Sequence, residues 1–430
     1  MLKINSIKNI SESLITYDYS YSKEIKKYFT KDKFFVEYIS MNTTKIPNHI
    51  KIIPFLANVA PISWFAGFDI QIEDVDECFY NSLMAVKEEF KKYYPTLVKD
   101  TQVKYNNLIK TEYSANKSAM LFSGGLDSFT TYFRHRNENL DLITIHGADI
   151  PIEDTKQWNK VLSYNENELI IAKNKKYYIK SNIRDFYSFD VDRLLPNLEW
   201  WGQIQHGLSL TATIAPLAFL NGYERIYIAS SETRDTRKQG SKILLWGSMP
   251  ETDNKIAWAN TVVINDGELT RQEKIEAVVT VARNTQDKIN LRVCYSENNE
   301  NLNCSVCEKC IRTSFGIMIA GDNPNHYGFN VDASIYQRVK AFISNGFKSP
   351  GNQLIWKSIL DYMLSNNNFF IFEQRDIERQ RYEEIIKTLK VQTNSEIKKL
   401  TKYQKFKLDI MGRYPKLFNQ YLILRKGTKK

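Results

Sequence analysis

Short apolar runs that alternate with amphipathic segments constrain the fold of this chain more than any other feature. The apolar runs predict strands, and the segments between them predict helices. The expected strands are 118–122, 141–146, 176–180, 225–229 and 261–265. The expected helices are 126–136, 154–164, 202–221 and 270–283. Because the strands are continuously apolar, we expect an α/β fold, with a parallel sheet covered by helices on both faces.

The flanking segments have a different character. A chain of 430 residues is long enough for two or three domains. We expect an N-terminal α+β domain, the α/β domain and a helical C-terminal extension, at residues 1–112, 113–325 and 326–430. Within the first part, the sequence predicts β-like runs at Ile50–Ile53 and Phe68–Ile72, and a helix from Asp74 to Tyr94 that Pro95 ends.

The net charge of +10 is concentrated at the C-terminus. Residues 397–430 hold eleven Lys or Arg and a single acid, Asp409. Such a basic tail could bind nucleic acid, but a solvated helix packed on the body is the more ordinary interpretation, so a nucleic-acid partner is not favoured. No apolar run reaches 18 residues and the first residues lack an apolar signal core. The sequence therefore predicts a cytoplasmic protein without a membrane partner.

A paired glycine follows the first predicted strand of the α/β part, in the sequence Ser-Gly-Gly-Leu-Asp-Ser at 123–128. Gly124 and Gly125 permit positive φ and close approach to a ligand, and the N–H groups of a turn before a helix can hold an anion. Ser123 and Ser128 add hydroxyl donors. Asp127 would repel a polyphosphate unless it reaches Mg²⁺ or orders the loop. We therefore expect ATP with Mg²⁺ here; the alternative is a tight turn with a serine cap.

Four of the five cysteines lie close together in the sequence. Cys294, Cys304, Cys307 and Cys310 have the spacing Cys-x9-Cys-x2-Cys-x2-Cys. In a reducing compartment, clustered thiols more often hold metal than form disulfides. Four thiolates without an open position suit structural Zn²⁺, and a [4Fe–4S] cluster is the rival.

These two motifs together resemble a known family. The residues at 123–128 match the PP-loop of the N-type ATP pyrophosphatases and are no Walker motif, because no Gly-Lys-Ser/Thr follows. With the cysteine set, residues 116–320 resemble the 7-cyano-7-deazaguanine synthase family (QueC). The resemblance implies a HUP-like (adenine nucleotide alpha hydrolase-like) core with a zinc knuckle. It also implies cleavage of ATP between the α and β phosphates, adenylation of a carboxylate, and catalytic roles for Asp127 and Ser128.

The chain departs from ordinary synthases in ways that change the expected acceptor. It has about 110 extra residues on each side of the matched block, and His146-Gly-Ala-Asp149 replaces a Tyr-Gly-Gln-Arg-His type of sequence. Residues 244–275 look like the enlarged QueC-like proteins of bacterial anti-phage defence systems. That likeness implies an AMP-forming carbon–nitrogen ligase that joins 7-carboxy-7-deazaguanine to an amine of a partner protein, notably its N-terminus. The alternatives are a 7-cyano-7-deazaguanine synthase that uses ammonia and a non-catalytic nucleotide-binding scaffold in a defence complex.

The same late segment offers candidates for binding the ring of the substrate. Trp246, Ser248, Asp253 and Trp258 lie in a stretch that looks too polar for a core and too aromatic for a plain loop. Tryptophan would supply a stacking face, and Asp253 could accept hydrogen bonds from the ring N–H groups. A surface aspartate is the alternative.

Two cations and two histidines complete the candidate set. Arg271 and Lys274 open a predicted helix and could neutralise phosphate charge, although a solvated helical face is the alternative. His146 ends a predicted strand on the ligand side, and His206 lies in the long helix predicted after Trp200-Trp201. Either histidine could meet nucleotide or substrate, and a satisfied structural histidine is the alternative for each.

Overall fold

The structure is a computed structural model. It describes residues 1–196, 198–230, 238–239, 242–243, 246–294, 302–346, 350–366 and 371–392. The basic segment 397–430 and the first two residues of 244–275 therefore lie outside the described residues. Among the described residues, no helix has the length and apolar character that crossing a membrane requires.

An α/β fold is confirmed by an eleven-stranded, mostly parallel sheet within the described residues. Its order is β14-β15-β11-β8-β9-β10-β3-β2-β1-β4-β6. The five central parallel strands are β15 (Thr261–Asp266), β11 (Tyr223–Ala229), β8 (Lys117–Leu121), β9 (Asp141–His146) and β10 (Lys176–Ser181). All five lie where the apolar runs predict them, to within two residues at each end.

The order of the central strands has a direct consequence for ligand binding. In chain order they are β8, β9, β10, β11 and β15. Across the sheet their order is β10-β9-β8-β11-β15, so β9 and β10 lie on one side of β8, and β11 and β15 lie on the other. The chain thus reverses its direction of travel across the sheet beside β8. Doubly wound sheets bind their ligands outside the carboxyl ends of the strands at such a switch point. The Ser123–Ser128 turn follows β8 directly and so lies at this position.

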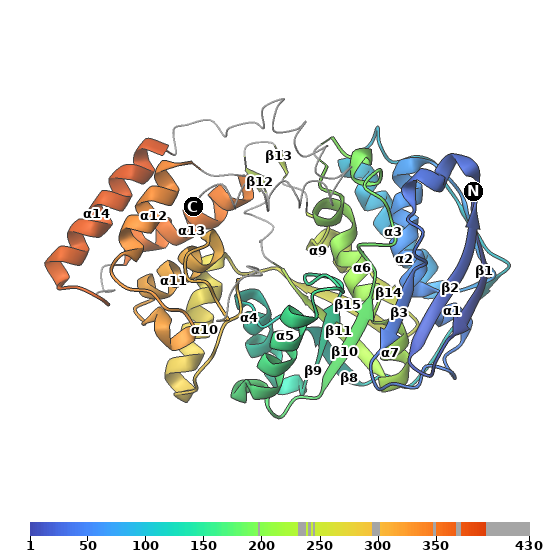
Figure 1. The fold of residues 1–430 in the computed structure, drawn as a ribbon, viewed down its shortest axis with the longest axis horizontal. Helices are drawn as coiled ribbons and strands as arrows, with labels where there is room; N and C mark the ends of the chain where they lie inside the picture. Colours follow the sequence, from blue (N-terminus) through green and yellow to red (C-terminus); the bar gives the residue numbers. More distant parts are fainter. Residues whose placement is uncertain are drawn as a thin grey trace.

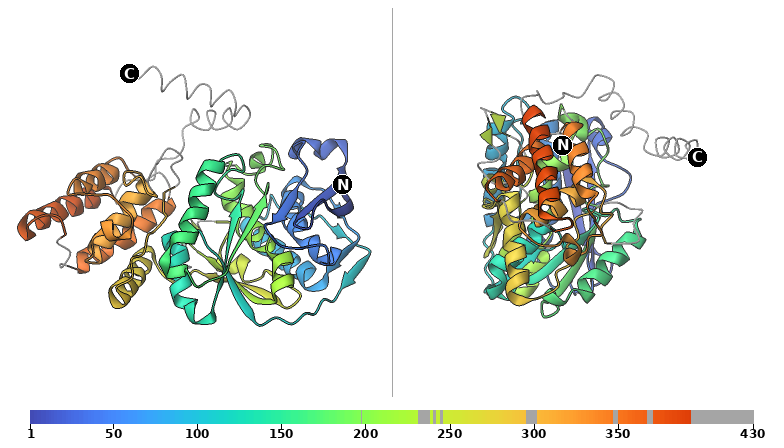
Figure 2. Two further views of the ribbon diagram at one scale, coloured as in Figure 1. Left: turned by 60° about the horizontal axis from the view of Figure 1, so that its bottom comes forward. Right: turned by 90° about the vertical axis from the view of Figure 1, so that its left-hand side faces the viewer.

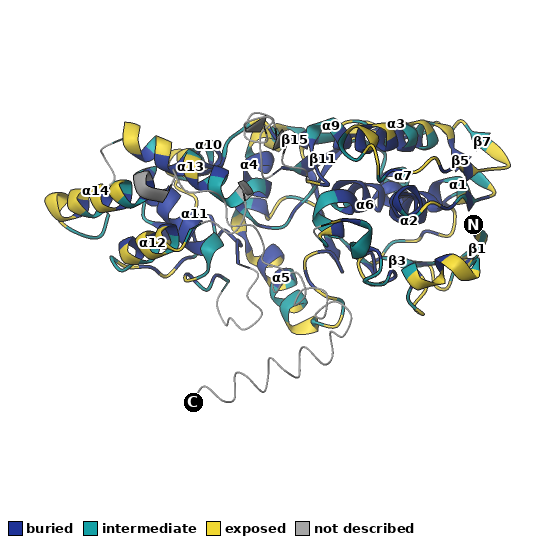
Figure 3. Cartoon of the chain, turned by 90° about the horizontal axis from the view of Figure 1, so that it is seen from above, coloured by how far each residue is buried: buried dark blue, intermediate teal, exposed yellow. Residues whose placement is uncertain are grey.

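Helices cover both faces of the central sheet, and the alternation of side chains shows which face each strand residue joins. Ala119 and Ile226 pack in one hydrophobic cluster with α2 (Ile53–Ala66), α6 (His206–Ala212) and α7 (Ala215–Asn221). Met120 and Tyr227, the next residues along, pack in a second cluster with α4 (Leu126–His135), α5 (Thr155–Asn167) and α10 (Arg271–Thr285). Figure 3 shows α2 and α6 buried, whereas α14 has an exposed side.

The N-terminal strands extend the same sheet. They are β1 (Leu2–Asn9), β2 (Leu14–Tyr21), β3 (Phe35–Tyr38), β4 (Ile70–Gln71) and β6 (Val103–Lys104), and β3 pairs antiparallel with β10. The strands of residues 1–112 and those of the α/β part therefore share one sheet, and the proposed division into domains stays a prediction.

Two N-terminal expectations need correction. The run Ile50–Ile53 is not a strand but runs from α1 (Asn48–Lys51) to the first residue of α2. The sequence suggests a strand because α2 is buried on nearly all sides, so its residues show no helical period. The predicted helix from Asp74 instead begins at Glu77 as α3 (Glu77–Tyr93), where the Asp76 carboxylate caps the Phe79 N–H at 2.9 Å. Residues Asp74–Asp76 form β5, which pairs with β7 (Asn107–Ile109).

The long helix predicted at 202–221 is divided into three parts. A π-helical turn at Trp201–Gln205 precedes α6, and α7 begins after Thr213 and Ile214. Pro216 near the start of α7 explains the break, because proline cannot continue the hydrogen-bond ladder of α6. π-Helical turns are rare and occur often at functional sites.

The C-terminal helices lie together at one end of the molecule (Figure 1) and belong to the second hydrophobic cluster. They are α11 (Glu308–Ile319), α12 (Ile335–Ser344), α13 (Pro350–Ser365) and α14 (Arg375–Gln392). Figures 1 and 2 show this group on one side of the central sheet and the N-terminal strands on the other. The remaining elements are α9 (Pro250–Asp253), β12 (Lys238–Gln239), β13 (Lys242–Ile243), β14 (Ala257–Trp258) and short 3₁₀ turns at Lys23–Tyr28, Arg136–Glu138, Leu169–Ile171, Asp192–Leu194 and Pro324–Tyr327.

Candidate functional site

The turn after β8 requires its first glycine for two reasons. Gly124 has φ +74°, which lies in the left-handed region that side chains disfavour. A Cβ atom there would also lie 2.4 Å from Cε1 of Tyr164, which α5 brings against the turn. Gly125 is the residue before α4 and has an extended backbone. The close packing of Tyr164 on Gly124 fixes the turn from the α5 side.

The two serines of the turn bind to the turn itself. The Ser123 Oγ accepts the Gly125 N–H at 3.3 Å, and the Ser128 hydroxyl donates to the Gly125 carbonyl at 3.0 Å. The two hydroxyl oxygens are 3.3 Å apart. These are local bonds within the turn; the residue that caps α4 is Gly125, and no side chain caps the helix. The roles of both hydroxyls toward phosphate stay predictions.

Asp127 is paired with two cations from α10. Its carboxylate oxygens lie 2.9 Å from Arg271 Nη1 and 3.0 Å from Lys274 Nζ. Burial alone would raise the pKa of Asp127, but the charges and hydrogen bonds of Lys274 and Arg271 outweigh burial and hold it well below its usual range. Of the two roles predicted for Asp127, ordering the site accounts for these contacts, and a contact with Mg²⁺ stays a prediction.

Arg271 and Lys274 are inside the protein, so the alternative of a solvated helical face is wrong. Arg271 is 7% exposed and Lys274 is 1% exposed. Arg271 Nη2 also donates to Thr313 Oγ1 at 3.2 Å, and Lys274 Nζ donates to the carbonyl of Ser230, the residue after β11. Lys274 thus joins the carboxyl ends of β8 and β11 across the switch point.

Helix α11 adds two further cations that the sequence reasoning missed. Arg312 Nη1 donates to Glu308 at 2.9 Å, and burial lowers the pKa of Arg312 to about 10. Burial, followed by the charge of Arg312, lowers the pKa of the half-buried Lys309 to about 8. The charge of Arg271 also lowers this pKa, whereas the charge of Asp127 raises it. A signal was present in the sequence, because residues three apart on a helix share a face.

We call Arg271, Lys274, Lys309 and Arg312 the cation cluster. Asp127 pairs with Arg271 and Lys274, Glu308 pairs with Arg312, and Asp149 and Asp127 act electrostatically on Lys309. Within the described residues, Nε of Arg271 and Nε of Arg312 are buried without a hydrogen-bond partner. Two buried guanidinium N–H groups without an acceptor favour a bound anion.

The four clustered cysteines converge in space. Their Sγ atoms all lie within 4.8 Å of one another. The separations are 3.8 Å for Cys294–Cys307, 3.8 Å for Cys304–Cys310 and 3.4 Å for Cys307–Cys310. A tetrahedral site with bonds of about 2.3 Å places its sulfurs about 3.8 Å apart. The four thiols could therefore hold a metal ion such as zinc.

Three aromatic side chains meet at the π-helical turn, and we call Trp201, His206 and Trp246 the aromatic ledge. The His206 ring centre lies 5.6 Å from that of Trp201 and 5.6 Å from that of Trp246. A Cβ at Gly202 would lie 2.7 Å from the Trp246 ring, so glycine lets this ring approach the turn closely. Trp246 is 39% exposed, and Arg184 stacks on Trp201 at 4.9 Å.

His206 has an unsatisfied polar atom in this arrangement. Its Nδ1 is buried and lacks a hydrogen-bond partner in the part of the chain that the structure describes. Burial lowers the pKa of His206 to about 4. The imidazole is therefore neutral near pH 7. Exposed Asp149 acts electrostatically on both His206 and Lys309, so it lies near both the ledge and the cation cluster.

The stretch that holds Ser248, Asp253 and Trp258 belongs to the core, so the expectation that it is too polar for a core is wrong. All three residues are buried, and Trp258 and Asp253 are 0% exposed. Ser248 donates to Asp253 Oδ2 at 2.5 Å and Asn265 Nδ2 donates to it at 2.7 Å. Burial is tolerated because these polar groups pair with one another.

Asp253 also shapes α6. A Cβ at Gly207 would lie 2.1 Å from Asp253 Oδ1, so the helix approaches the carboxylate closely. The alternative of a surface aspartate is wrong. A substrate could reach Asp253 only if these contacts opened, and its role as an acceptor for the ring stays a prediction.

His146 lies at the carboxyl end of β9 but is packed as a structural histidine. It is buried, its Nε2 lies 3.1 Å from the Pro151 carbonyl, and its ring stacks on Trp158 at 4.4 Å. Burial lowers the pKa of His146. These contacts agree with the structural alternative, and a contact with nucleotide stays a prediction.

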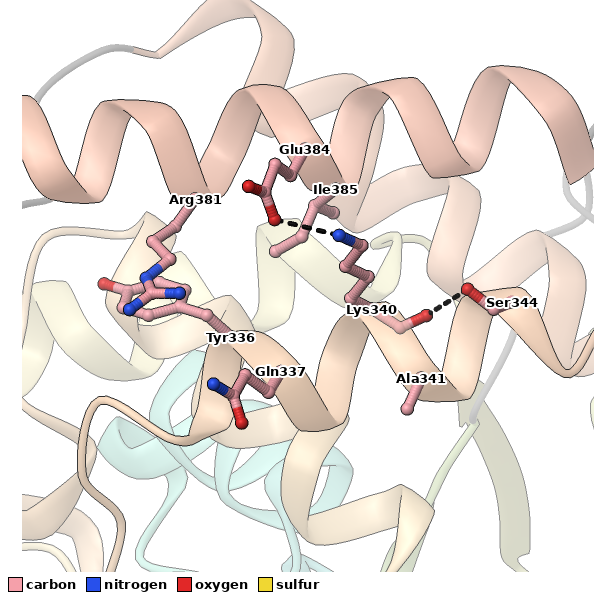
Figure 4. A pocket seen from close by; sticks show the side chains of 8 residues that line it. All are labelled: Tyr336, Gln337, Lys340, Ala341, Ser344, Arg381, Glu384 and Ile385. Carbon is pink, nitrogen blue, oxygen red and sulfur yellow. Dashed lines mark hydrogen bonds and ion pairs between the residues drawn. The ribbon is translucent and has the colours of Figure 1, made fainter.

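A cavity of about 380 Å³ lies elsewhere, between α12 and α14 (Figure 4). Lys340 and Glu384 pair across it at 2.9 Å. Its lining residues are Tyr336, Gln337, Lys340, Ala341, Ser344, Arg381, Glu384 and Ile385. None of them belongs to the turn, the cation cluster or the aromatic ledge.

Comparisons with known proteins returned nothing: no family model matches the chain, and neither the curated proteins nor the solved structures gave a match. The likeness to the PP-loop enzymes therefore rests on the residues at 123–128 and on the four cysteines.

Proposed function

We propose that this chain is an ATP-dependent ligase that adenylates a carboxylate, releases pyrophosphate and transfers the acyl group to an amine. The observation that carries the proposal is the cation cluster beside a glycine turn at the switch point of the sheet. A triphosphate would supply acceptors for the buried Nε groups of Arg271 and Arg312, and the turn and the start of α4 would supply N–H donors.

In the proposed first step, the cation cluster and Asp127 would assist the departure of pyrophosphate. A carboxylate oxygen attacks the α-phosphorus, and the bond to the β-phosphate oxygen breaks with its electron pair leaving on pyrophosphate. The cation cluster would stabilise this departing charge. Asp127 would keep Arg271 and Lys274 aligned for this task. Mg²⁺, when bound with the nucleotide, would neutralise part of the phosphate charge.

The second step forms the amide. The amine nitrogen attacks the acyl carbon, the bond between this carbon and the AMP oxygen breaks, and the nitrogen loses a proton. For the acyl donor we propose 7-carboxy-7-deazaguanine. Its flat ring would stack on the aromatic ledge and form a hydrogen bond with His206 Nδ1. For the amine we propose the N-terminus of a partner protein in an anti-phage defence system.

For the cysteine centre we propose Zn²⁺. Four thiolates at tetrahedral separations leave no open position for a reaction, as in structural zinc sites. Cys307 precedes α11 and Cys310 lies in its first turn. The ion would thus hold the end of the helix that carries Lys309 and Arg312.

Isotope exchange between pyrophosphate and ATP tests the first step. The purified protein, MgATP and labelled pyrophosphate should give labelled ATP only when 7-carboxy-7-deazaguanine is present. Intact mass spectrometry of a candidate partner protein then tests amide formation. Exchange together with formation of the free nitrile when ammonia is supplied would favour the synthase instead. Nucleotide binding without any exchange would favour the scaffold and defeat the proposal.

A further inference from the structure

Residues 289–294, which we call the strap, run against the glycine turn. The backbone N–H of Arg292 donates to the Gly124 carbonyl at 2.7 Å. Nη1 of the same arginine donates to the Ser123 carbonyl at 2.8 Å. Arg292 is 7% exposed. One residue of the strap therefore holds both carbonyl groups of the turn.

These two bonds determine where the N–H groups of the turn point. In a planar trans peptide the C=O and the following N–H point in opposite directions. When Arg292 holds the Ser123 and Gly124 carbonyls, the N–H groups of Gly124 and Gly125 point away from the strap. Arg292 thus sets the direction of both N–H groups; because the Gly125 N–H also donates to the Ser123 Oγ at 3.3 Å, the Gly124 N–H is the donor that an anion at the turn would use.

The other end of the strap is part of the cysteine centre. Cys294 follows Arg292 by two residues and contributes one of the four Sγ atoms. Asn303, beside Cys304, accepts the Val293 N–H at 3.0 Å and donates to the Leu291 carbonyl at 2.7 Å. The strap is thereby fixed by the side chain of Asn303, the residue that precedes Cys304.

We propose that Arg292 is a positioning residue that couples the cysteine centre to the glycine turn, so that loss of metal from the centre lowers the anion affinity of the turn without direct contact. The statement about affinity rests on the proposed function, since it requires phosphate binding at the turn. The positioning role of Arg292 rests on its two hydrogen bonds alone. The two therefore need separate measurements.

The first experiment replaces the side chain of Arg292. Inorganic tripolyphosphate without Mg²⁺ is the probe, titrated calorimetrically into wild type, R292M, R292K and the control R283M. Arg283 also donates to a carbonyl, that of Ala320 at 3.0 Å, but away from the turn. We expect R292M to bind the probe about tenfold or more weakly, with unchanged metal content, and R283M to bind as wild type does. R292K keeps the charge and should bind with intermediate affinity, and it carries the test where R292M does not fold.

Amide hydrogen exchange measures positioning without any ligand. Peptides that cover residues 122–129 should exchange faster in R292M, and faster in wild type after a chelator has removed the metal. C294S should behave like the metal-free protein, whereas C78S, which changes the cysteine outside the cluster, should not. Unchanged exchange at the turn in R292M and in the metal-free protein would overturn the inference. Failure of wild type to bind tripolyphosphate would instead overturn the proposed function, so the two failures are distinguishable.

Discussion

Lys274 Nζ lies 3.0 Å from Asp127 Oδ1 and at the same time donates to the Ser230 carbonyl. Asp127 follows β8 and Ser230 follows β11, so this lysine connects the two strands that flank the switch point. Arg271 holds the second oxygen of Asp127 at 2.9 Å. The carboxylate at the centre of the site is therefore the partner of two buried cations, and its removal has a definite expected effect.

Replacement of Asp127 by asparagine should destabilise the protein and be relieved by anions. The change leaves Arg271 and Lys274 without their counter-charge, and breaking a buried pair in this way costs about 3–5 kcal/mol. Urea unfolding should show this loss, and tripolyphosphate should recover part of it. E268Q is the matched control, because Glu268 pairs with Arg134 on the surface and its loss should cost less than about 1 kcal/mol. Equal losses in the two variants would contradict this account of Asp127.

Gly124→Ala should impair both folding stability and nucleotide binding, for two separable reasons. Gly328 has a similar φ, +82° against +74°, but a Cβ there would meet nothing nearer than 3.6 Å. G328A therefore measures the backbone strain alone, about 1–2 kcal/mol. G124A should exceed it because Cβ would collide with Tyr164. Y164A alone should destabilise the core, but within a Y164A background the added cost of G124A in thermal unfolding should fall to that of G328A. A G124A variant as stable as G328A would show that the collision is absent.

The sequence predicted the parts of the fold that local pattern determines. The central strands are buried on both sides, so their apolar runs are visible without knowledge of the partners. The run at Ile50–Ile53 has the same appearance, but it continues into α2, a helix buried on nearly all sides, and a helix without a polar face gives no period of 3.6. Pro47 and Pro54 at the helix starts were the only local signals of this difference.

The candidate site was predictable only where one segment supplies it. The turn at 123–128 and the cysteine spacing are local: the turn follows β8 directly, and the four Sγ atoms converge so that they could hold a metal ion. Lys309 and Arg312 come near Arg271 and Asp127 only because α11 packs beside α10. The local sequence does not specify this packing. The burial of Asp253 and Trp258 also depends on distant partners, such as Asn265 for the aspartate. Long-range pairing therefore marks the limit of the sequence-based interpretation.

Trp246→Ala should weaken binding of the carboxylate substrate and leave binding of the nucleotide unchanged. Trp246 is the exposed member of the aromatic ledge, whereas the cation cluster belongs to α10 and α11. Loss of one stacked ring should raise KM for 7-carboxy-7-deazaguanine about threefold to tenfold in the exchange assay, with KM for ATP unchanged. W246F should retain most of the affinity because it keeps a stacking face. A rise in KM for ATP alone would place the ring of the nucleotide, not that of the acid, on the ledge.

Acidification should destabilise the protein in part through His206. Its folded pKa, about 4, lies below the value of about 6.5 expected in the unfolded chain, so the unfolded state binds more protons between these values. The stability that neutral His206 contributes is complete above pH 6.5 and declines as the pH falls toward 4. His206→Phe removes this titration, so the difference in unfolding free energy between wild type and variant should change by about 3 kcal/mol between pH 7 and pH 4. H326N, at an exposed histidine, is the control and should follow wild type. Parallel pH profiles for wild type and H206F would show that His206 titrates normally and that the ledge is open to water.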